Sequence, residues 1–102
     1  PKLLDLGSKT CIPCRMMEPI LAELKKDYAG RLDVEFIDVG LRENAAMAQQ
    51  YGLKVIPTQV FLDKDGKELW RHEGAIGEDD LLAELEAAGV SLISTEPADP
   101  KS

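Results

Sequence analysis

The apolar residues of this chain recur with two different spacings, and the two spacings alternate along the sequence. Short runs of leucine, β-branched and aromatic residues predict strands, whereas apolar residues three and four positions apart predict amphipathic helices. Strand-like runs occupy Lys2–Leu6, Val34–Val39, Thr58–Leu62 and Lys67–Glu73, and helical spacing occupies Cys11–Tyr28, residues 42–51 and residues 77–88. The order β-α-β-α-β-β-α predicts an α/β fold in which helices flank a mixed central sheet of about four strands.

Glycine and proline residues mark the ends of these elements. Gly30, Gly52 and Gly89 follow the three predicted helices, where a glycine favours termination. Residues 63–66, with the sequence Asp-Lys-Asp-Gly, separate the last two strands. This is a strong hairpin signal, so we expect these strands to be antiparallel neighbours. Pro19 is interior to the first helix and predicts a kink there.

Length and charge narrow the classes of function. The 102 residues fit one domain, which we place at residues 1–90, followed by a flexible Ser/Pro/Asp-rich tail at 91–102. The net charge is −7, from 12 Lys and Arg against 19 Asp and Glu, and the basic residues form no stripe. We therefore expect no nucleic-acid partner. No apolar run approaches the roughly 18 residues of a spanning helix, so we expect no membrane insertion of this segment.

The compartment is open at this stage. Because the sequence starts at Pro1 rather than at Met, a longer precursor with a removed signal or anchor is compatible with it. A cytoplasmic and an extracytoplasmic location are the two alternatives.

Two cysteines lie three residues apart in Cys11-Ile12-Pro13-Cys14, between the first predicted strand and the first predicted helix. Free backbone N–H groups and the helix dipole favour an anion at a helix N-terminus, so we expect the Cys11 thiolate to be stabilised. Cys14 lies one turn further on and can close a small disulfide ring with it. This spacing suits reversible exchange, in which Cys11 attacks a substrate disulfide and Cys14 resolves the mixed disulfide.

Three other interpretations of the cysteine pair are open: half of a zinc site, a structural disulfide, or a chance pair of core cysteines. Zinc is disfavoured because a structural site needs four ligands and the single histidine, His72, comes 58 residues after Cys14. Redox chemistry is favoured because a strand-loop-helix junction places a thiol at the surface. We expect neither a metal nor a cofactor.

The sequence resembles the thioredoxin family over nearly all of residues 2–89. The matching features, in family order, are the Cys11–Cys14 motif, Pro19, Val55-Ile56-Pro57-Thr58 at the entry to the third strand and Gly74-Ala75 before the last helix. The resemblance implies a thioredoxin-like fold and a thiol-disulfide oxidoreductase, more narrowly a protein-disulfide reductase, with roles in electron transport and cell redox homeostasis. Its partners would be protein disulfide or dithiol substrates and an upstream redox partner, and we expect a monomer.

The resemblance also implies site residues. It predicts a cis peptide bond before Pro57, which would pack against the cysteine pair as part of the catalytic site; an ordinary strand-entry proline is the alternative. The backbone beside it would accept extended substrate polypeptide. The residues expected to bind substrate are Ile12, Pro13, Ile56, Thr58 and Gly74.

Asp5 matches the family's buried acid, six residues before the first cysteine. A carboxyl in an otherwise leucine-rich strand is expected to be desolvated and partly protonated near neutral pH. It would then take the proton from Cys14 as the mixed disulfide resolves. The alternative is an aspartate at the strand end that faces solvent.

The chain departs from the family pattern around the motif. Gly7 and Thr10 stand where the family usually has tryptophans, Ile12-Pro13 replaces the common Gly-Pro pair, and the strand at 34–39 has no lysine to pair with the buried acid. We also expect the chain to begin at the first central strand, without the family's leading strand and helix. Substrate choice, redox potential and the direction of electron flow therefore stay open.

Other residues indicate less specific roles. His72 is expected to be edge-facing or half-buried rather than a catalytic base, and the acids that open the last helix are expected to cap it. Met16-Met17 beside Cys14 suggests soft ligands for copper, but Met17 lies on the apolar stripe of its helix and favours core packing. The alternative function is a thioredoxin-scaffold binding module, a copper carrier or docking domain, with the cysteines as ligands or as a structural disulfide.

Overall fold

The computed structural model describes residues 1–89. The tail predicted at 91–102 lies outside the described residues. The elements follow the predicted order, with one short 3-10 turn added: β1 (Lys2–Gly7), α1 (Ile12–Asp27), β2 (Asp33–Asp38), η1 (Arg42–Asn44), α2 (Ala45–Gln50), β3 (Thr58–Leu62), β4 (Glu68–Glu73) and α3 (Glu78–Ala87). Among these helices, none combines the length and apolar character needed to cross a bilayer.

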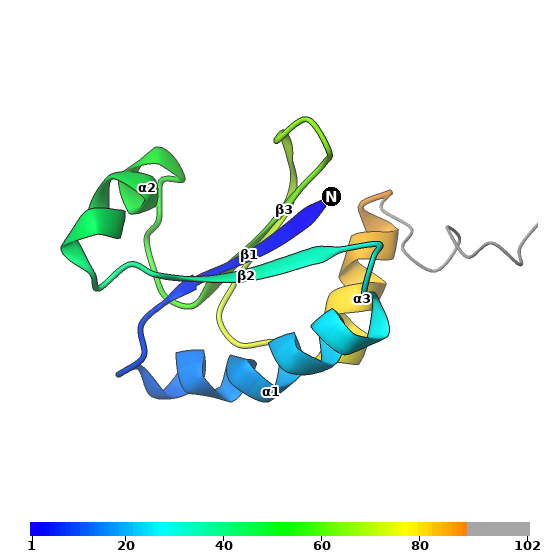
Figure 1. The fold of residues 1–102 in the computed structure, drawn as a ribbon, viewed down its shortest axis with the longest axis horizontal. Helices are drawn as coiled ribbons and strands as arrows, with labels where there is room; N and C mark the ends of the chain where they lie inside the picture. Colours follow the sequence, from blue (N-terminus) through cyan, green and yellow to red (C-terminus); the bar gives the residue numbers. More distant parts are fainter. Residues whose placement is uncertain (90–102) are drawn as a thin grey trace, which may run out of the picture.

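The four strands form one mixed sheet in the order β2-β1-β3-β4. The central strand β1 is parallel to β2 and antiparallel to β3, and β3 is antiparallel to β4. Helices α1 and α3 lie together on one side of the sheet, and α2 lies on the other side (Figure 1). The predicted class, a mixed four-stranded sheet flanked by helices, is therefore confirmed.

The apolar stripe of α1 packs on the face of the sheet that also carries α3. Met17, Leu21 and Leu24 are buried at helical spacing, as their periodicity predicts. They join one core cluster with residues of the sheet, of the loops and of α3: Leu3, Tyr28, Leu32, Val34, Phe61, Ile76, Leu81 and Leu85. Pro19 lies inside α1, as expected, and Gly30, which follows the helix, has a φ of 83°.

The opposite face of the sheet carries a second, smaller core cluster. Its buried members are Leu4, Leu6, Ile37, Val60 and Leu62, and partly buried residues around α2, including Met47 and Tyr51, pack against them. The predicted helix over residues 42–51 is divided into η1 and a six-residue α2, neither of which has a fully buried residue. With so little apolar surface to bury, this segment forms only short helical turns.

The hairpin between β3 and β4 forms as predicted. The backbone N–H of Gly66 donates to the Asp63 carbonyl, and Asp63 Oδ1 accepts from the backbone N–H groups of Asp65 and Lys67. Gly66 has a φ of 85°, a conformation that glycine adopts without steric strain.

Strand register places four side chains in one row across the sheet. Asp5 of β1 pairs with Phe36 of β2 and with Gln59 of β3, and Gln59 pairs with His72 of β4. Directly paired residues point to the same face of a sheet. Leu3 and Phe61, two residues from Asp5 and Gln59, belong to the cluster with α1 and α3, so the row faces α1.

Candidate active site

The cysteine motif forms the start of α1. Cys11 is the N-cap, with an extended backbone, and its Sγ accepts a hydrogen bond from the backbone N–H of Cys14 at 3.3 Å. Pro13 lies in the first turn, where its missing N–H has no helical partner. Before the helix, the backbone N–H of Cys11 donates to the Ser8 carbonyl. The loop and the cap thus hold the Cys11 sulfur at the end of the helix.

The two thiols have different access to solvent. Both are free thiols, and Cys11 is partly exposed whereas Cys14 is 2% exposed. The pKa of Cys14 is raised to about 11, chiefly by burial and also by the neighbouring Cys11 sulfur and the Asp5 charge, while a backbone hydrogen bond from Ser8 partly opposes the rise. Cys14 is therefore a protonated thiol at neutral pH. Cys11 is therefore accessible from solvent, whereas Cys14 is enclosed and would have to lose a proton before it could react as a thiolate.

Asp5 lies completely inside the protein, with 0% of its surface exposed. The solvent-facing alternative is therefore wrong. Desolvation raises the pKa of Asp5 from 3.8 to about 6, and a hydrogen bond from Gln59 partly opposes the rise. Asp5 Oδ1 accepts from Gln59 Nε2 at 3.0 Å, while Oδ2 is buried and has no hydrogen-bond partner among the described residues. The carboxyl thus has one buried oxygen to which none of the described residues donates.

Gly7 brings β1 close to the buried thiol. A Cβ atom at this position would lie 2.8 Å from Cys14 Sγ and 3.2 Å from Cys14 Cβ. Gly7 follows Asp5 on the same face of the strand. The glycine that stands where the family usually has a tryptophan therefore lets Cys14 approach the strand that carries the acid.

The peptide bond between Ile56 and Pro57 is cis, as the resemblance implies. Pro57 is buried and immediately precedes Thr58, which pairs with Leu6 of β1. Pro57 is therefore at the level of Gly7, the residue that approaches Cys14. This register brings the proline and the cysteine pair to the same end of the sheet.

The residues predicted to bind substrate differ in exposure. Ile12 is 74% exposed and Ile56 is also exposed, but the Thr58 side chain is buried and its hydroxyl donates to the Val55 carbonyl at 2.8 Å. The backbone N–H of Gly74 donates to the Pro57 carbonyl at 2.7 Å. Thr58 and Gly74 therefore support the proline loop, and Ile12 and Ile56 present apolar surface.

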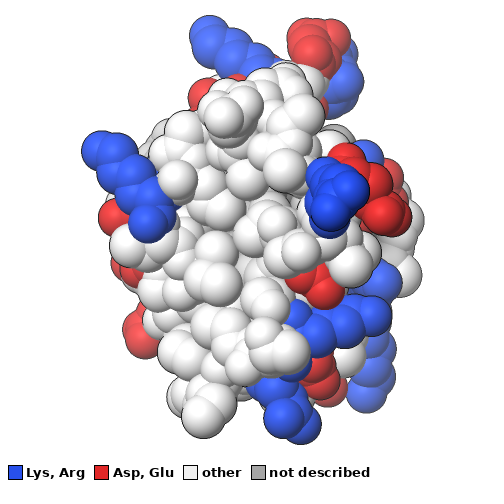
Figure 2. Space-filling model, turned by 90° about the vertical axis from the view of Figure 1, so that its left-hand side faces the viewer, with Lys and Arg blue, Asp and Glu red and all other residues white. Residues whose placement is uncertain are grey.

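The end of the molecule that carries the motif is largely uncharged. Figure 2 shows this end as a mostly white face with Lys, Arg, Asp and Glu side chains towards its rim. The exposed apolar residues that belong to this end come from the first turns of α1, the segment after β2 and the proline loop: Ile12, Met16, Leu41, Val55 and Ile56. An uncharged face around an accessible thiol can accept a polypeptide of varied sequence.

Sequence reasoning missed Gln59. It is a fully buried polar residue in a strand whose other residues are also buried, and it hydrogen-bonds Asp5 from β3, whereas the strand at 34–39 has no lysine to do so. The signal in the sequence is a single amide directly before the apolar run Val-Phe-Leu at 60–62. His72 is half-buried, as expected; its Nδ1 lies 3.0 Å from Gln59 Oε1 and its ring stacks on Trp70.

The copper interpretation loses one of its ligands in this fold. Met17 is fully buried, and its sulfur accepts a hydrogen bond from the backbone N–H of Ile76 at 3.4 Å. Its predicted role in core packing is confirmed. Met16, in contrast, is exposed.

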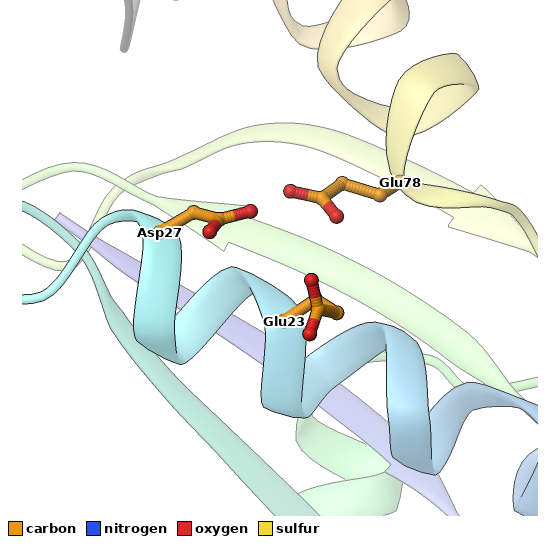
Figure 3. A group of neighbouring side chains, drawn as sticks. All are labelled: Glu23, Asp27 and Glu78. Carbon is orange, nitrogen blue, oxygen red and sulfur yellow. The ribbon is translucent and has the colours of Figure 1, made fainter.

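A separate group of acids lies between α1 and α3. Glu23 and Asp27, one turn apart on α1, point toward Glu78 at the start of α3 (Figure 3), with ligand atoms within 4.8 Å of one another. Desolvation and the nearby carboxylates, Asp27 first, raise the pKa of Glu78 to about 7. Their oxygens are close because the two helices pack together.

The fold and the site together define a class: a thioredoxin-fold protein with a Cys-x-x-Cys pair at the N-terminus of the first helix after a central strand. Known proteins support this assignment. The family model described as Thioredoxin matches residues 1–87. The chain is similar to the thioredoxin of Mycolicibacterium smegmatis, with 39% identity over 88 residues that cover 86% of this chain and 78% of that protein.

A thioredoxin of Pseudomonas aeruginosa is 37% identical over 87 residues, which cover 85% of this chain and 78% of the relative. A solved structure titled "Structure of a malarial protein" superimposes with a TM-score of 0.77 at 25% identity, covering 87% of this chain and 97% of that one. The chain belongs to the thioredoxin family, which is a family of thiol-disulfide oxidoreductases.

Proposed function

We propose that this protein is a protein-disulfide reductase in which Cys11 is the nucleophile, Cys14 the resolving thiol and Asp5 the proton acceptor. The observation that carries the proposal is the contrast within the pair. A partly exposed N-capping thiol stands next to a buried thiol of raised pKa, and a buried carboxyl lies near the second one. An accessible nucleophile and a protected resolving group are what two-step exchange needs.

The first step forms a mixed disulfide. The Cys11 thiolate attacks one sulfur of a substrate disulfide, and the other substrate sulfur leaves as a thiolate, which takes a proton from solvent. The negative charge on Cys11 disappears in this step. Two of the effects that raise the pKa of Cys14, the hydrogen bond and the charge of Cys11, disappear with it. Formation of the mixed disulfide therefore makes Cys14 easier to deprotonate.

The second step releases the substrate. Asp5 Oδ2 accepts the proton of Cys14, and the new thiolate attacks Cys11 Sγ. The Cys11–Cys14 disulfide forms, the mixed disulfide breaks, and the second substrate sulfur leaves as a thiolate that takes a proton from solvent, while Asp5 later releases the Cys14 proton to solvent. The substrate gains two electrons and the protein loses two. An upstream dithiol partner then restores the pair by the reverse exchange, and the direction follows the difference in potentials.

We also propose that substrates are extended polypeptides that dock on the uncharged face around the motif. Ile12 and Ile56 supply its exposed apolar surface, Pro13 fills the first turn of the helix, and Pro57 borders the cysteine pair. All of these groups come from one chain, so the protein works as a monomer in this mechanism.

The test is reduction of insulin by dithiothreitol, followed by precipitation of the released B chain. The wild type and a Lys64→Ser control, changed in the distant β3–β4 turn, should accelerate precipitation. Cys11→Ser should fall to the uncatalysed rate. The proposal fails if Cys11→Ser is as active as the wild type. It also fails if the pair binds Cu(I) tightly, with both thiols protected from alkylation, and shows no insulin reduction.

A further inference from the structure

A line of hydrogen bonds leads from the buried acid to the far edge strand. Gln59 Nε2 donates to Asp5 Oδ1 at 3.0 Å, and Gln59 Oε1 lies 3.0 Å from His72 Nδ1. The three side chains come from β1, β3 and β4 and are directly paired in the sheet. Asp5 and Gln59 are fully buried, whereas His72 is half-buried on the edge strand.

Donor and acceptor chemistry sets the direction of this line. A carboxylate oxygen only accepts, so the Gln59 NH₂ group must face Asp5 and the Gln59 carbonyl must face His72. That carbonyl also only accepts, so His72 Nδ1 must carry a hydrogen. If Nδ1 carried no hydrogen, its lone pair would face the Gln59 carbonyl oxygen, and the two acceptors would repel each other in this orientation of the amide. A hydrogen on His72 Nδ1 therefore favours the same orientation of the Gln59 amide as the Asp5 carboxylate does.

The same arrangement decides which oxygen of Asp5 is available. Gln59 occupies Oδ1, and Oδ2 is buried without a hydrogen-bond partner among the described residues. A proton that arrives at this carboxyl therefore meets no competing hydrogen-bond donor at Oδ2. If the Gln59 amide were reversed, its carbonyl would face Oδ1 and would require the proton there instead.

We propose that Gln59 and His72 are positioning residues for the acid: His72 orients the Gln59 amide, and Gln59 holds Asp5 so that Oδ2 is the oxygen that receives the proton. The proposal rests on the proposed function, because the proton is that of Cys14. In this chain a neutral amide and an imidazole would be the polar partners of the buried acid, because the strand at 34–39 has no lysine to pair with it.

Residues of β2, β4 and α1 surround the three hydrogen-bonded side chains. Around Asp5, β2 contributes Phe36 in the same row and α1 contributes the Cys14 thiol, which is the titratable group there. On β4, the Trp70 ring stacks on the imidazole at 6.1 Å between centroids and 11° between planes. Arg71 and Glu73 flank His72 along the strand and alternate to the opposite face. Trp70 thus steadies the ring that Gln59 contacts.

The first readout needs no catalysis. The Asp5 carboxyl is titrated by ¹³C NMR in the oxidised protein, with Asp5→Asn used for assignment. Gln59→Leu removes a donor to a charged acceptor, so the titration should move upward by about one pH unit. His72→Leu should move it in the same direction by less. His72→Asn, whose amide nitrogen can occupy the place of Nδ1, should return it toward the wild-type value.

The second readout isolates the proton-transfer step. Reduced protein is mixed with the disulfide DTNB: the first thionitrobenzoate released reports attack by Cys11, and the second reports attack by Cys14 on Cys11. The rate of the second release is divided by the rate of the first at each pH. In Gln59→Leu and His72→Leu, the pH midpoint of this ratio should move upward, as the Asp5 titration does by NMR. Lys64→Ser should leave both releases at wild-type rates.

The outcomes separate the two proposals. If Asp5→Asn leaves the second release unchanged, Asp5 is not the acceptor and that part of the proposed function fails, whereas the NMR titration still decides whether Gln59 and His72 position the carboxyl. The positioning proposal is overturned if Asp5 titrates at the wild-type pH in both leucine variants, or if His72→Asn behaves like His72→Leu. Since His72 is at the half-buried edge, its variants remain informative if Gln59→Leu does not fold.

Discussion

Replacing Asp5 by asparagine should make the protein more stable, and the gain should depend on pH. The acid has a pKa of about 6 in the folded protein and 3.8 as its ordinary value, because folding removes its carboxylate from water. A difference of about 2.2 pH units corresponds to about 3 kcal/mol of unfolding free energy. Asparagine is uncharged at every pH and escapes this penalty.

The sign follows from proton binding. The folded state binds its Asp5 proton more tightly than the unfolded state, so the contribution of that proton to stability is complete below about pH 3.8 and is lost as pH rises to about 6. The difference in unfolding free energy between Asp5→Asn and wild type should therefore rise by about 1.4 kcal/mol per pH unit between these values. Above pH 6 it should level off.

The assay is urea unfolding of both oxidised proteins from pH 4 to pH 8. Oxidation removes the thiols from the titration, and subtraction of the two curves removes groups common to both proteins. The buried amide of the variant adds an offset that does not change with pH. A difference that is flat across this range would refute the reasoning, because it would mean that folding does not desolvate a charged Asp5.

Two further predictions concern Gly7 and the acids between α1 and α3. Gly7→Ala should destabilise the protein by about 1–2 kcal/mol, because the added Cβ would lie 2.8 Å from Cys14 Sγ and overpack this contact. Alanine also lowers the entropy of the unfolded chain, but that stabilising effect is smaller than the cost of overpacking. An unchanged urea midpoint would contradict this prediction. Glu78→Gln should raise the Tm at pH 8 but not at pH 4, since the raised pKa of Glu78 means that wild type loses stability as pH climbs from about 4.5 to about 7. Equal Tm differences at both pH values would show that the carboxylates around Glu78 do not repel it.

Much of the fold could be predicted because hydrophobic spacing is a local property. The stripe of α1 and the apolar strands could be located within a few residues, and the Asp-Gly turn identified the hairpin. The segment at 42–51 was harder to predict. Its apolar residues are few, and the division into η1 and α2 depends on contacts with β2, such as the Asn44 amide donating to the Asp38 carbonyl.

The site was predictable where one stretch of sequence contains both partners, as in the Cys11–Cys14 motif. It was not predictable where partners meet across strands. Gln59 approaches Asp5 only because β3 runs antiparallel to β1 in one particular register, and a shift by one residue would turn the amide to the other face. The meeting of Glu78 with Asp27 likewise depends on the packing of α3 against α1.

The most direct test of the central claim is to trap the intermediate. Cys14→Ser and Cys11→Ser proteins are each mixed with a disulfide-bonded polypeptide, quenched with acid and weighed by intact mass spectrometry. The mechanism predicts that Cys14→Ser accumulates a mixed disulfide with the substrate on Cys11, and that Cys11→Ser, with only the buried thiol, accumulates almost none. Equal accumulation in the two variants, or accumulation only in Cys11→Ser, would contradict the assignment of Cys11 as the nucleophile.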